Sequence, residues 1–379
     1  MPTVTYPGRP LVSYPVLNVV YAALKIGIAL VRLPLWTLSF SFLRSLRPLP
    51  SWSFRQSLML RIFYEGLTVL STIELPSPLS LEPGKEKDRW VKLEPFPKDL
   101  YRGPLASKTV EPEVIGGTWY PQKPANAAAA GPILFHIHGG AFVVGDGRTG
   151  SSGQMFDRFH KHGKVGLAFL PQYRLSNRPT NAPFPAAVQD ALTGYLYLVR
   201  TLGVPASSIT VSGDSAGGNI AIALLRYLAE HAADLGIPQP RSAVIIAPWV
   251  APIKALWPEP ALRAGNPNFA SDYLPPVFMT WGAKTYMRDV SPDHPYVLPL
   301  GHPFRTPVPA LVTLGGGEIL AVDGVQWVRE MSAVEGNEIE SYIEADAPHD
   351  TVLVANELGW NESAARVAEK IGAFIRTHA

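Results

Sequence analysis

Residues 209–219 read ITVSGDSAGGN, and the rest of the chain can be organised around this stretch. A short apolar run (209–212) leads directly into a G-x-S-x-G sequence centred on Ser215, and a helical stretch (217–232) follows at once. The turn from strand to helix in such a sequence is so tight that the serine takes a strained backbone conformation. Gly213 and Gly217 avoid clashes there, and the serine hydroxyl is exposed at the positive end of the helix. The stretch therefore predicts Ser215 as a nucleophile.

A second glycine-containing motif lies upstream. Residues 133–137 (ILFHI) form an apolar run, and residues 138–142 (HGGAF) follow it. A glycine pair after an early strand can direct backbone N–H groups at the oxygen on which negative charge develops during acyl transfer. We therefore expect the N–H groups of Gly139, Gly140 and Ala216 to form an oxyanion hole. His138 is expected to hold this loop by hydrogen bonds rather than to act as a base.

From about residue 114 onward, short apolar runs alternate with helical stretches. Buried apolar strands separated by helices indicate a mostly parallel sheet with helices on both faces. The expected strands are 133–137, 165–170, 209–212, 243–247, 310–314 and 339–343, and the expected helices are 186–201, 217–232, 324–335 and 362–378. One insertion, at about 249–306, has no clear strand and many aromatic and proline residues, so we expect it to form a lid.

The composition limits the possible classes of function. The chain has 379 residues, of which 47% are hydrophobic and 17% charged, and this is enough for a large core. A net charge of +2 argues against a nucleic-acid partner, and the absence of cysteine excludes disulfides, thiolate metal sites and a cysteine nucleophile. The glycines at 315–317 lack the continuation of a dinucleotide-binding motif. We expect neither an organic cofactor nor a metal ion.

Six motifs occur in a fixed order along the chain. They are HGGAF (138–142), with alanine in a third glycine place, QYRL (172–175), PFPAA (183–187) followed by Asp190, GDSAGGN (213–219), PWV (248–250) and SDY (271–273). Together they resemble the hormone-sensitive-lipase-like family of α/β-hydrolases, including its fungal members, over about residues 110–379. The resemblance implies an α/β-hydrolase fold, with a mostly parallel central sheet flanked by helices and a helical cap or lid. It also implies the activity of a serine carboxylesterase or lipase.

The resemblance also indicates the base of a catalytic triad, whose members follow in the order serine, acid, histidine. Residues 347–350 read APHD and lie between the last expected strand and a helix. The family has P-H-G at this place, so His349 is the expected base, with Asp350 in the position of the glycine. The other histidines of the chain lack this context.

The acid is expected directly after the strand at 310–314. Residues 315–320 read GGGEIL, and Glu318 stands where the family has an aspartate. A glutamate can do the same work, because it can accept the histidine N–H and stabilise the imidazolium. We therefore expect Glu318 to be the acid. Asp323 and Asp346 are the alternatives, and their other possible roles are a helix N-cap and a surface turn.

The N-terminal part of the chain is apolar and basic. No acidic residue precedes Glu65, whereas Lys25 and Arg32 lie seven apart inside the apolar stretch 15–46. We expect Pro34 to break this stretch, so that it is not a clean spanning helix. Residues 12–64 are expected to contact a membrane surface, to form a pair of cap helices over an apolar pocket, or to do both.

Two parts of the chain are expected from this pattern. Residues 1–110 form an apolar, basic, helical segment with a linker, and residues 111–379 form the catalytic domain with its lid insertion. Because the basic residues lie inside the apolar run, and no small-residue cleavage site follows, the segment does not resemble a secretory signal peptide. We therefore expect an intracellular protein, either cytoplasmic or peripherally or monotopically bound to a membrane, and not a secreted one.

These observations predict a serine hydrolase that cleaves carboxylic esters of apolar small molecules through Ser215, Glu318, His349 and an acyl-enzyme. Two alternatives stay open. A biosynthetic acyltransferase, lactonase or cyclase would use the same fold with a nucleophile other than water, and the glutamate and the basic apolar N-terminus resemble fungal members linked to small-molecule metabolism. A ligand receptor without catalysis is the other. The plant gibberellin receptor resembles this family but lacks the triad histidine, which is present here.

Overall fold

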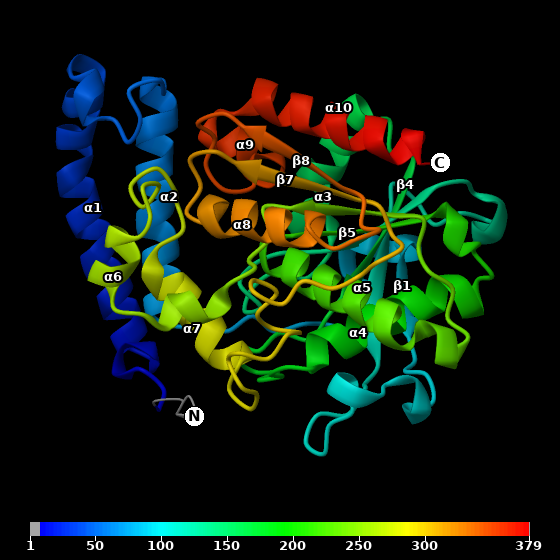
Figure 1. Cartoon of the computed structure of the whole chain (residues 1–379). Helices are drawn as coiled ribbons and strands as arrows, with labels where there is room; N and C mark the ends of the chain where they lie inside the picture. Colours follow the sequence, from blue (N-terminus) through cyan, green and yellow to red (C-terminus); the bar gives the residue numbers. More distant parts are fainter. Residues whose placement is uncertain (1–7, 379) are drawn as a thin grey trace.

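The computed structural model describes residues 8–378, and within them eight strands form one sheet (Figure 1). The strands are β1 (Trp90–Leu93), β2 (Ile115–Tyr120), β3 (Ile133–Ile137), β4 (Leu167–Gln172), β5 (Ile209–Asp214), β6 (Ser242–Ile246), β7 (Ala310–Gly315) and β8 (Ile339–Glu344). Their order across the sheet is β1-β2-β4-β3-β5-β6-β7-β8. Pairs from β4 to β8 are parallel, and the pairs β1–β2 and β2–β4 are antiparallel. The expected α/β architecture is therefore confirmed.

The parallel strands bring several chain segments to one edge of the sheet. In the register of the sheet, Ile137 at the end of β3 lies opposite Gly213 in β5, and Gly315 at the end of β7 lies opposite Glu344 in β8. Every residue of β3, β5, β6 and β7 is buried, as the apolar runs predicted. The segments that follow these strands therefore meet at the carboxyl edge, where open α/β sheets bind their ligands.

Helices cover the sheet and extend beyond it (Figure 1). Their bounds are α1 (Leu17–Phe42), α2 (Phe54–Thr72), α3 (Thr149–Arg158), α4 (Ala186–Leu196), α5 (Ser215–Leu235), α6 (Glu259–Ala264), α7 (Pro276–Tyr286), α8 (Ala321–Ser332), α9 (Thr351–Leu358) and α10 (Asn361–Thr377). α4 packs with α5, whereas α10 packs with α3 and α9 on the other side of the sheet. The four helices expected from the sequence correspond to α4, α5, α8 and α10, and the six expected strands correspond to β3–β8.

Two strands were not expected. β1 lies in the segment 1–110, for which a mostly helical and irregular structure was expected, and these four residues depart from that description. β2 contains Gly116 and Gly117, and a Cβ atom on either would lie within 2.3 Å of the ring of Trp90 or Phe169. Glycine inside a strand allows such a close approach but weakens the sequence pattern of the strand. The division of the chain at residue 110 stays a prediction, and residues 1–7 of its first part lie outside the described residues.

The insertion at about 249–306 contains no strand in the structure, as expected. It includes a short helical turn (Pro252–Leu256), α6 and α7. α7 packs against α2, so the insertion meets the N-terminal part of the chain.

The expectation that Pro34 breaks the apolar stretch is wrong. α1 runs without interruption for 26 residues, with Pro34 inside it. A proline in a helix removes one backbone hydrogen bond, the one its missing N–H would make to the residue four positions earlier, and the ladder on either side can continue. By length and composition α1 could cross a membrane, and no residue of its most apolar stretch is buried.

Two helices were expected to form a cap, and α2 is the one that lies in the position of a cap. Ser53 and Gln56 form a capping box at its start, where the Ser53 side chain accepts a bond from the Gln56 N–H. α2 packs on α7 and α9, next to the carboxyl edge of the sheet. α1 packs on α2 at the side of the molecule away from the sheet (Figure 1).

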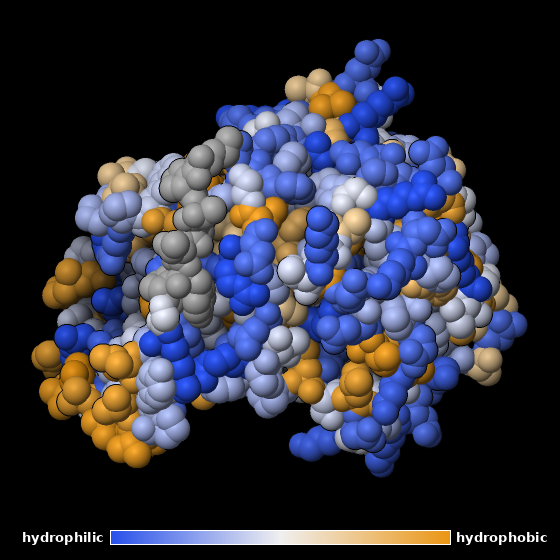
Figure 2. Space-filling view, turned by 90° about the horizontal axis from the view of Figure 1, so that it is seen from below, coloured by the Kyte–Doolittle hydropathy of each residue, from blue (hydrophilic) through white to orange (hydrophobic). Residues whose placement is uncertain are grey.

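The surface of α1 is strongly apolar. Figure 2 shows hydrophobic side chains gathered on the side of the molecule where α1 lies. The large apolar residues of α1 that are exposed are Leu17, Val19, Val20, Leu24, Ile26, Ile28, Leu30, Val31, Leu35, Leu38 and Phe42. Soluble monomers rarely expose a contiguous apolar surface of this kind without a use for it.

Candidate active site

Ser215 sits at the junction of β5 and α5, as the sequence predicted. Its φ of +52° is in the left-handed region, which costs an ordinary residue free energy. The turn is tight enough that a Cβ atom on Gly213 would lie 2.3 Å from the Gly217 carbonyl oxygen, and one on Gly217 would lie 2.1 Å from the Ile137 oxygen. The two glycines are therefore required by the space around the turn. They hold Ser215 at the N-terminus of α5.

Glu318 and His349 are hydrogen-bonded to each other. The His349 Nδ1 donates to Glu318 Oε2 over 2.7 Å, and both side chains are buried. The two loops are also joined through their backbones, because the Gly317 N–H donates to the Ala347 carbonyl oxygen at 2.8 Å. With Nδ1 engaged in this way, the Nε2 atom of His349 is the ring nitrogen available for proton exchange.

The two alternative acids have partners other than the base. Asp323 forms an ion pair with Lys254 at 2.5 Å, in the first turn of α8. Asp346 accepts a hydrogen bond from the Ser51 hydroxyl at 2.8 Å, and its carbonyl oxygen accepts one from the Trp52 indole N–H at 2.7 Å. The structure therefore brings Glu318 to His349, and uses Asp323 and Asp346 elsewhere.

Burial and mutual charge set the titration of the Glu318–His349 pair. Burial raises the pKa of Glu318 to about 7, and the hydrogen bond from His349 acts in the opposite direction. Burial lowers the pKa of His349, but the bond to Glu318 and its charge outweigh this effect, so the pKa of His349 is raised. A proton is therefore stabilised on His349, as the acceptor of a serine proton requires.

Asp272 holds the acid and base loops together, and sequence reasoning did not assign it a role in the site. Its carboxylate accepts hydrogen bonds from the Ile319 N–H at 2.7 Å and from the His349 N–H at 3.4 Å. It therefore fixes the backbone next to Glu318 and that of His349. The SDY motif marked the position, but no pattern in the sequence shows which loops the side chain reaches.

One of the three expected oxyanion donors is engaged elsewhere. The Gly139 N–H donates to the Asp214 carboxylate at 2.8 Å, so the expectation for Gly139 is corrected. Gly140, with a φ of +100°, lines the cavity next to Ser215. Ala216 is in the first turn of α5, where a backbone N–H has no partner within the helix. Ala141, the next residue of the motif, also has a positive φ, of +50°.

His138 has the structural surroundings that were expected. Its Nδ1 hydrogen-bonds the Gly139 carbonyl oxygen at 2.8 Å, and its ring stacks on Tyr173 with a centroid distance of 4.2 Å. Burial lowers the pKa of His138, so the ring is neutral. His136 was not predicted to matter, yet its buried ring bridges Ser212 and Asp214 and so supports the strand end that carries the nucleophile.

Asp350, where the sequence resemblance implied a glycine, has unusual surroundings. Its φ is +44°, its side chain is buried, and it lines the same cavity as Asp214. Burial and the charge of Asp214 raise the pKa of Asp350 well above its usual range. Burial and the neighbouring Asp214 carboxylate therefore favour the protonated, neutral form of Asp350, because two adjacent buried carboxylates do not both ionise.

Ser215 and His349 line one cavity of about 540 Å³. Residues of both expected covers contribute to it. From α2 come Ile62, Phe63, Gly66, Leu67 and Leu70, and from the insertion come Tyr273, Leu274 and Phe278. Most of the wall is apolar, so the cavity is suited to an apolar group bound next to the serine.

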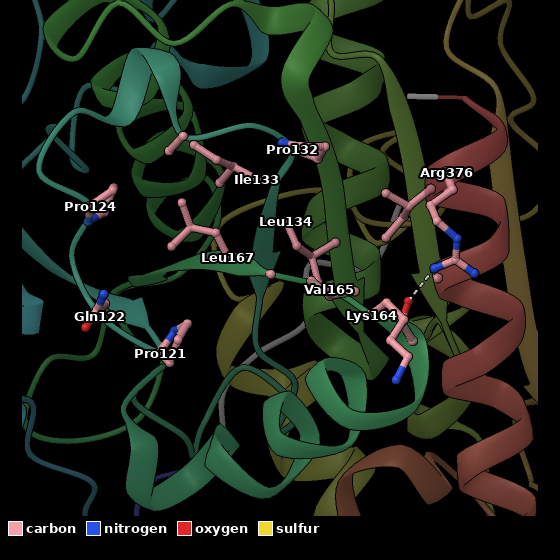
Figure 3. Close-up of a pocket in the computed structure, with 15 residues that line it drawn as sticks. Pro121, Gln122, Pro124, Pro132, Ile133, Leu134, Lys164, Val165, Leu167 and Arg376 are labelled. Carbon is pink, nitrogen blue, oxygen red and sulfur yellow. Dashed lines mark hydrogen bonds between the residues drawn. The ribbon is translucent and has the colours of Figure 1, made fainter.

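A cavity of about 440 Å³ lies at the opposite edge of the sheet (Figure 3). Ile133 and Leu167, at the beginnings of β3 and β4, line it together with Arg376 of α10, which donates to the Gly163 carbonyl oxygen at 2.7 Å. Its described lining contains no serine, histidine or carboxylate. Among residues 8–378, no group of three or more histidine or acidic residues is arranged to hold a metal ion.

Comparison with known proteins agrees with this geometry. The family model described as the alpha/beta hydrolase fold matches residues 134–353. An acetyl-hydrolase of Streptomyces hygroscopicus is 30% identical over 200 residues, covering 51% of this chain and 59% of that protein, which is less than two thirds of its length. An esterase of Acinetobacter venetianus is 27% identical over 269 residues, covering 69% of this chain and 79% of the other.

Solved structures share the fold. The crystal structure of an esterase from the bacterial hormone-sensitive lipase family superposes with a TM-score of 0.61 and 21% identity, covering 86% of this chain and 99% of that one. At this identity the likeness concerns the fold.

Proposed function

Since the chain belongs to the alpha/beta hydrolase fold family, we propose that it is a carboxylic ester hydrolase of the hormone-sensitive-lipase-like group, with Ser215 as its nucleophile. The observation that carries the proposal is the 2.7 Å bond from buried Glu318 to His349, a residue that lines the same cavity as Ser215. A serine, a histidine and a carboxylate in this arrangement form the constellation used for acyl transfer on several unrelated folds.

The proposed mechanism has two halves. His349 Nε2 takes the Ser215 proton while the serine oxygen attacks the ester carbonyl, and the imidazolium is stabilised by Glu318. The negative carbonyl oxygen accepts hydrogen bonds from the backbone N–H groups of Gly140 and Ala216, with Ala141 as a third donor in place of Gly139. The tetrahedral intermediate then expels the alcohol, which receives its proton from His349, and an acyl-enzyme remains. Water, activated by the same histidine, releases the acid.

Two further features support a class of substrate and a location at a membrane surface. The apolar lining of the cavity supports esters of apolar small molecules as substrates. The exposed apolar surface of α1, in a segment with basic residues and no acid before Glu65, supports association with an anionic membrane surface, because each basic residue near such a surface contributes about 1 kcal/mol.

An active-site probe tests the nucleophile. We expect a fluorophosphonate to label Ser215 and p-nitrophenyl acetate to be hydrolysed to free acetate. Ser215→Ala should lose both reactions with an unchanged circular dichroism spectrum, and Ser207→Ala, at an exposed serine, should keep both. Labelling of another serine would contradict the mechanism. An acyl group recovered on an acceptor other than water, without free acid, would assign an acyltransferase instead.

A further inference from the structure

A second apolar cavity of about 380 Å³ lies between α1 and α2. Its lining consists of Lys25, Ile26, Ala29, Leu30, Leu33 and Trp36 from α1 and Ile62, Glu65, Gly66 and Val69 from α2. Two of these residues are charged, and the others are apolar or glycine. Ile26 and Leu30 are also 55% and 62% exposed. This α1–α2 groove therefore opens on the apolar outer surface of α1.

The groove and the catalytic cavity share part of their wall. Ile62 and Gly66, one helical turn apart on α2, line both of them. Gly66 has no side chain to close the boundary, and a Cβ atom placed on it would have no heavy atom within 4 Å. The space beside Gly66 is therefore open, and the two cavities adjoin there.

The outer mouth of the groove faces the side of the molecule that is best suited to lipid. The exposed residues of α1 are large and apolar, and the basic residues Lys25 and Arg32 are on the same helix. Basic side chains can extend to lipid headgroups while their stems and the apolar neighbours stay in the hydrocarbon region. With α1 in contact with lipid, a molecule that leaves the bilayer at this face enters the groove without crossing water.

We propose that the substrates of this enzyme are lipophilic esters dissolved in a membrane, and that they reach Ser215 through the α1–α2 groove, passing Ile62 and Gly66. The inference rests on the proposed ester hydrolysis and adds a substrate class and a route. The acyl or alcohol chain occupies the groove, and its ester group lies in the catalytic cavity near Ser215 and His349. A water-soluble short ester has no need of this route.

The test compares two substrates for each variant. A long-chain p-nitrophenyl ester carried in phosphatidylcholine–phosphatidylserine vesicles reports the route, and p-nitrophenyl acetate in water reports the catalytic centre. Ala29→Trp fills the groove from α1, and Gly66→Leu fills the boundary. We expect each to lower the ratio of the vesicle-borne to the soluble rate by about tenfold or more. Gly27→Trp adds the same bulk on α1 outside the groove lining and should leave the ratio unchanged.

Each result has a defined meaning. An unchanged ratio in both Ala29→Trp and Gly66→Leu overturns the route, even if the wild-type protein cleaves both esters. A wild-type protein that cleaves neither ester overturns the proposed function itself. A protein that cleaves acetate, stays off the vesicles at low and high salt and forms a dimer in solution assigns the α1 surface to a second copy, and this also overturns the route.

Discussion

Glu318 stands where the sequence resemblance implied an aspartate, and its side chain reaches His349 at 2.7 Å. We expect Glu318→Gln to lower kcat for p-nitrophenyl acetate by about 10⁴-fold, because the amide no longer stabilises the imidazolium or fixes its tautomer. Asp323→Asn is the matched control. Its carboxylate pairs with Lys254 and should have little effect on kcat. The opposite ranking of the two variants would transfer the role to Asp323.

Asp350 provides a second prediction at this scale. Its pKa is raised in the folded protein, so its contribution to the free energy of unfolding is largest below the usual carboxyl pKa and is lost as the pH rises towards the folded value. Asparagine stays neutral at every pH. We therefore expect Asp350→Asn to be more stable than the wild-type protein at pH about 8 and to lose this advantage near pH about 4.

Urea unfolding at the two pH values measures this difference. Asp289→Asn, at an exposed aspartate next to Arg288, is the control and should show no comparable change with pH. If Asp350→Asn is less stable than the wild-type protein at both pH values, the ionised form of Asp350, and not its neutral form, stabilises the folded protein.

The sequence was informative for residues whose role follows from their own motif. Ser215, Glu318 and His349 each follow a strand in a recognisable context, and the structure brings the acid and the base together. The hydrogen bonds that side chains form with distant parts of the chain were not predictable. The Asp214 carboxylate takes the Gly139 N–H, and Asp272 reaches two loops that follow different strands. Such contacts depend on the finished packing, and a local pattern does not contain them.

At the scale of elements, the connection between α1 and α2 fastens the N-terminal helices to the catalytic part. Trp52 is 2% exposed, its indole donates to the Asp346 carbonyl oxygen, and its ring meets Trp360 edge to face at 4.8 Å. We expect Trp52→Ala to lower the free energy of unfolding by about 3–5 kcal/mol, measured by urea denaturation. Trp257→Ala, at a tryptophan that is 48% exposed, should cost about 0.5 kcal/mol or less. Equal losses would show that Trp52 does not anchor the connection.

The elements that were predicted well are those with a strong periodic or apolar pattern. β3–β8 and the helices α4, α5, α8 and α10 fall within a few residues of their expected bounds, whereas α3, α6, α7 and α9 were not expected. β1 and β2 were not predicted. β1 is short, and β2 contains two glycines, which leave room for neighbouring aromatic rings but weaken the apolar pattern of a strand. α1 was expected to break at Pro34, but the loss of one hydrogen bond did not interrupt a long run of helix-compatible residues.

At the scale of the whole molecule, the fold class followed from the sequence, whereas the position of the N-terminal helices did not. Periodicity identifies α1 and α2 as helices, but it does not say which of them covers the catalytic edge. α2 does so because it packs on α7 and α9, and α1 is left on the outside with its apolar surface exposed. α2 therefore forms the cover of the cavity, and the membrane contact that we propose belongs to α1.

The Trp52 anchor also determines where the chain can be shortened for expression and crystallisation. A chain that begins at residue 47 lacks the apolar surface of α1 and keeps Arg47, whose guanidinium donates to the Trp52 carbonyl oxygen at 2.7 Å. It also keeps α2 over the catalytic cavity. A cut after α2 removes the roof of the cavity together with the Ser51 and Trp52 bonds to the loop that carries His349. A water-soluble form that preserves the catalytic cavity should therefore start after α1 and no later than Arg47.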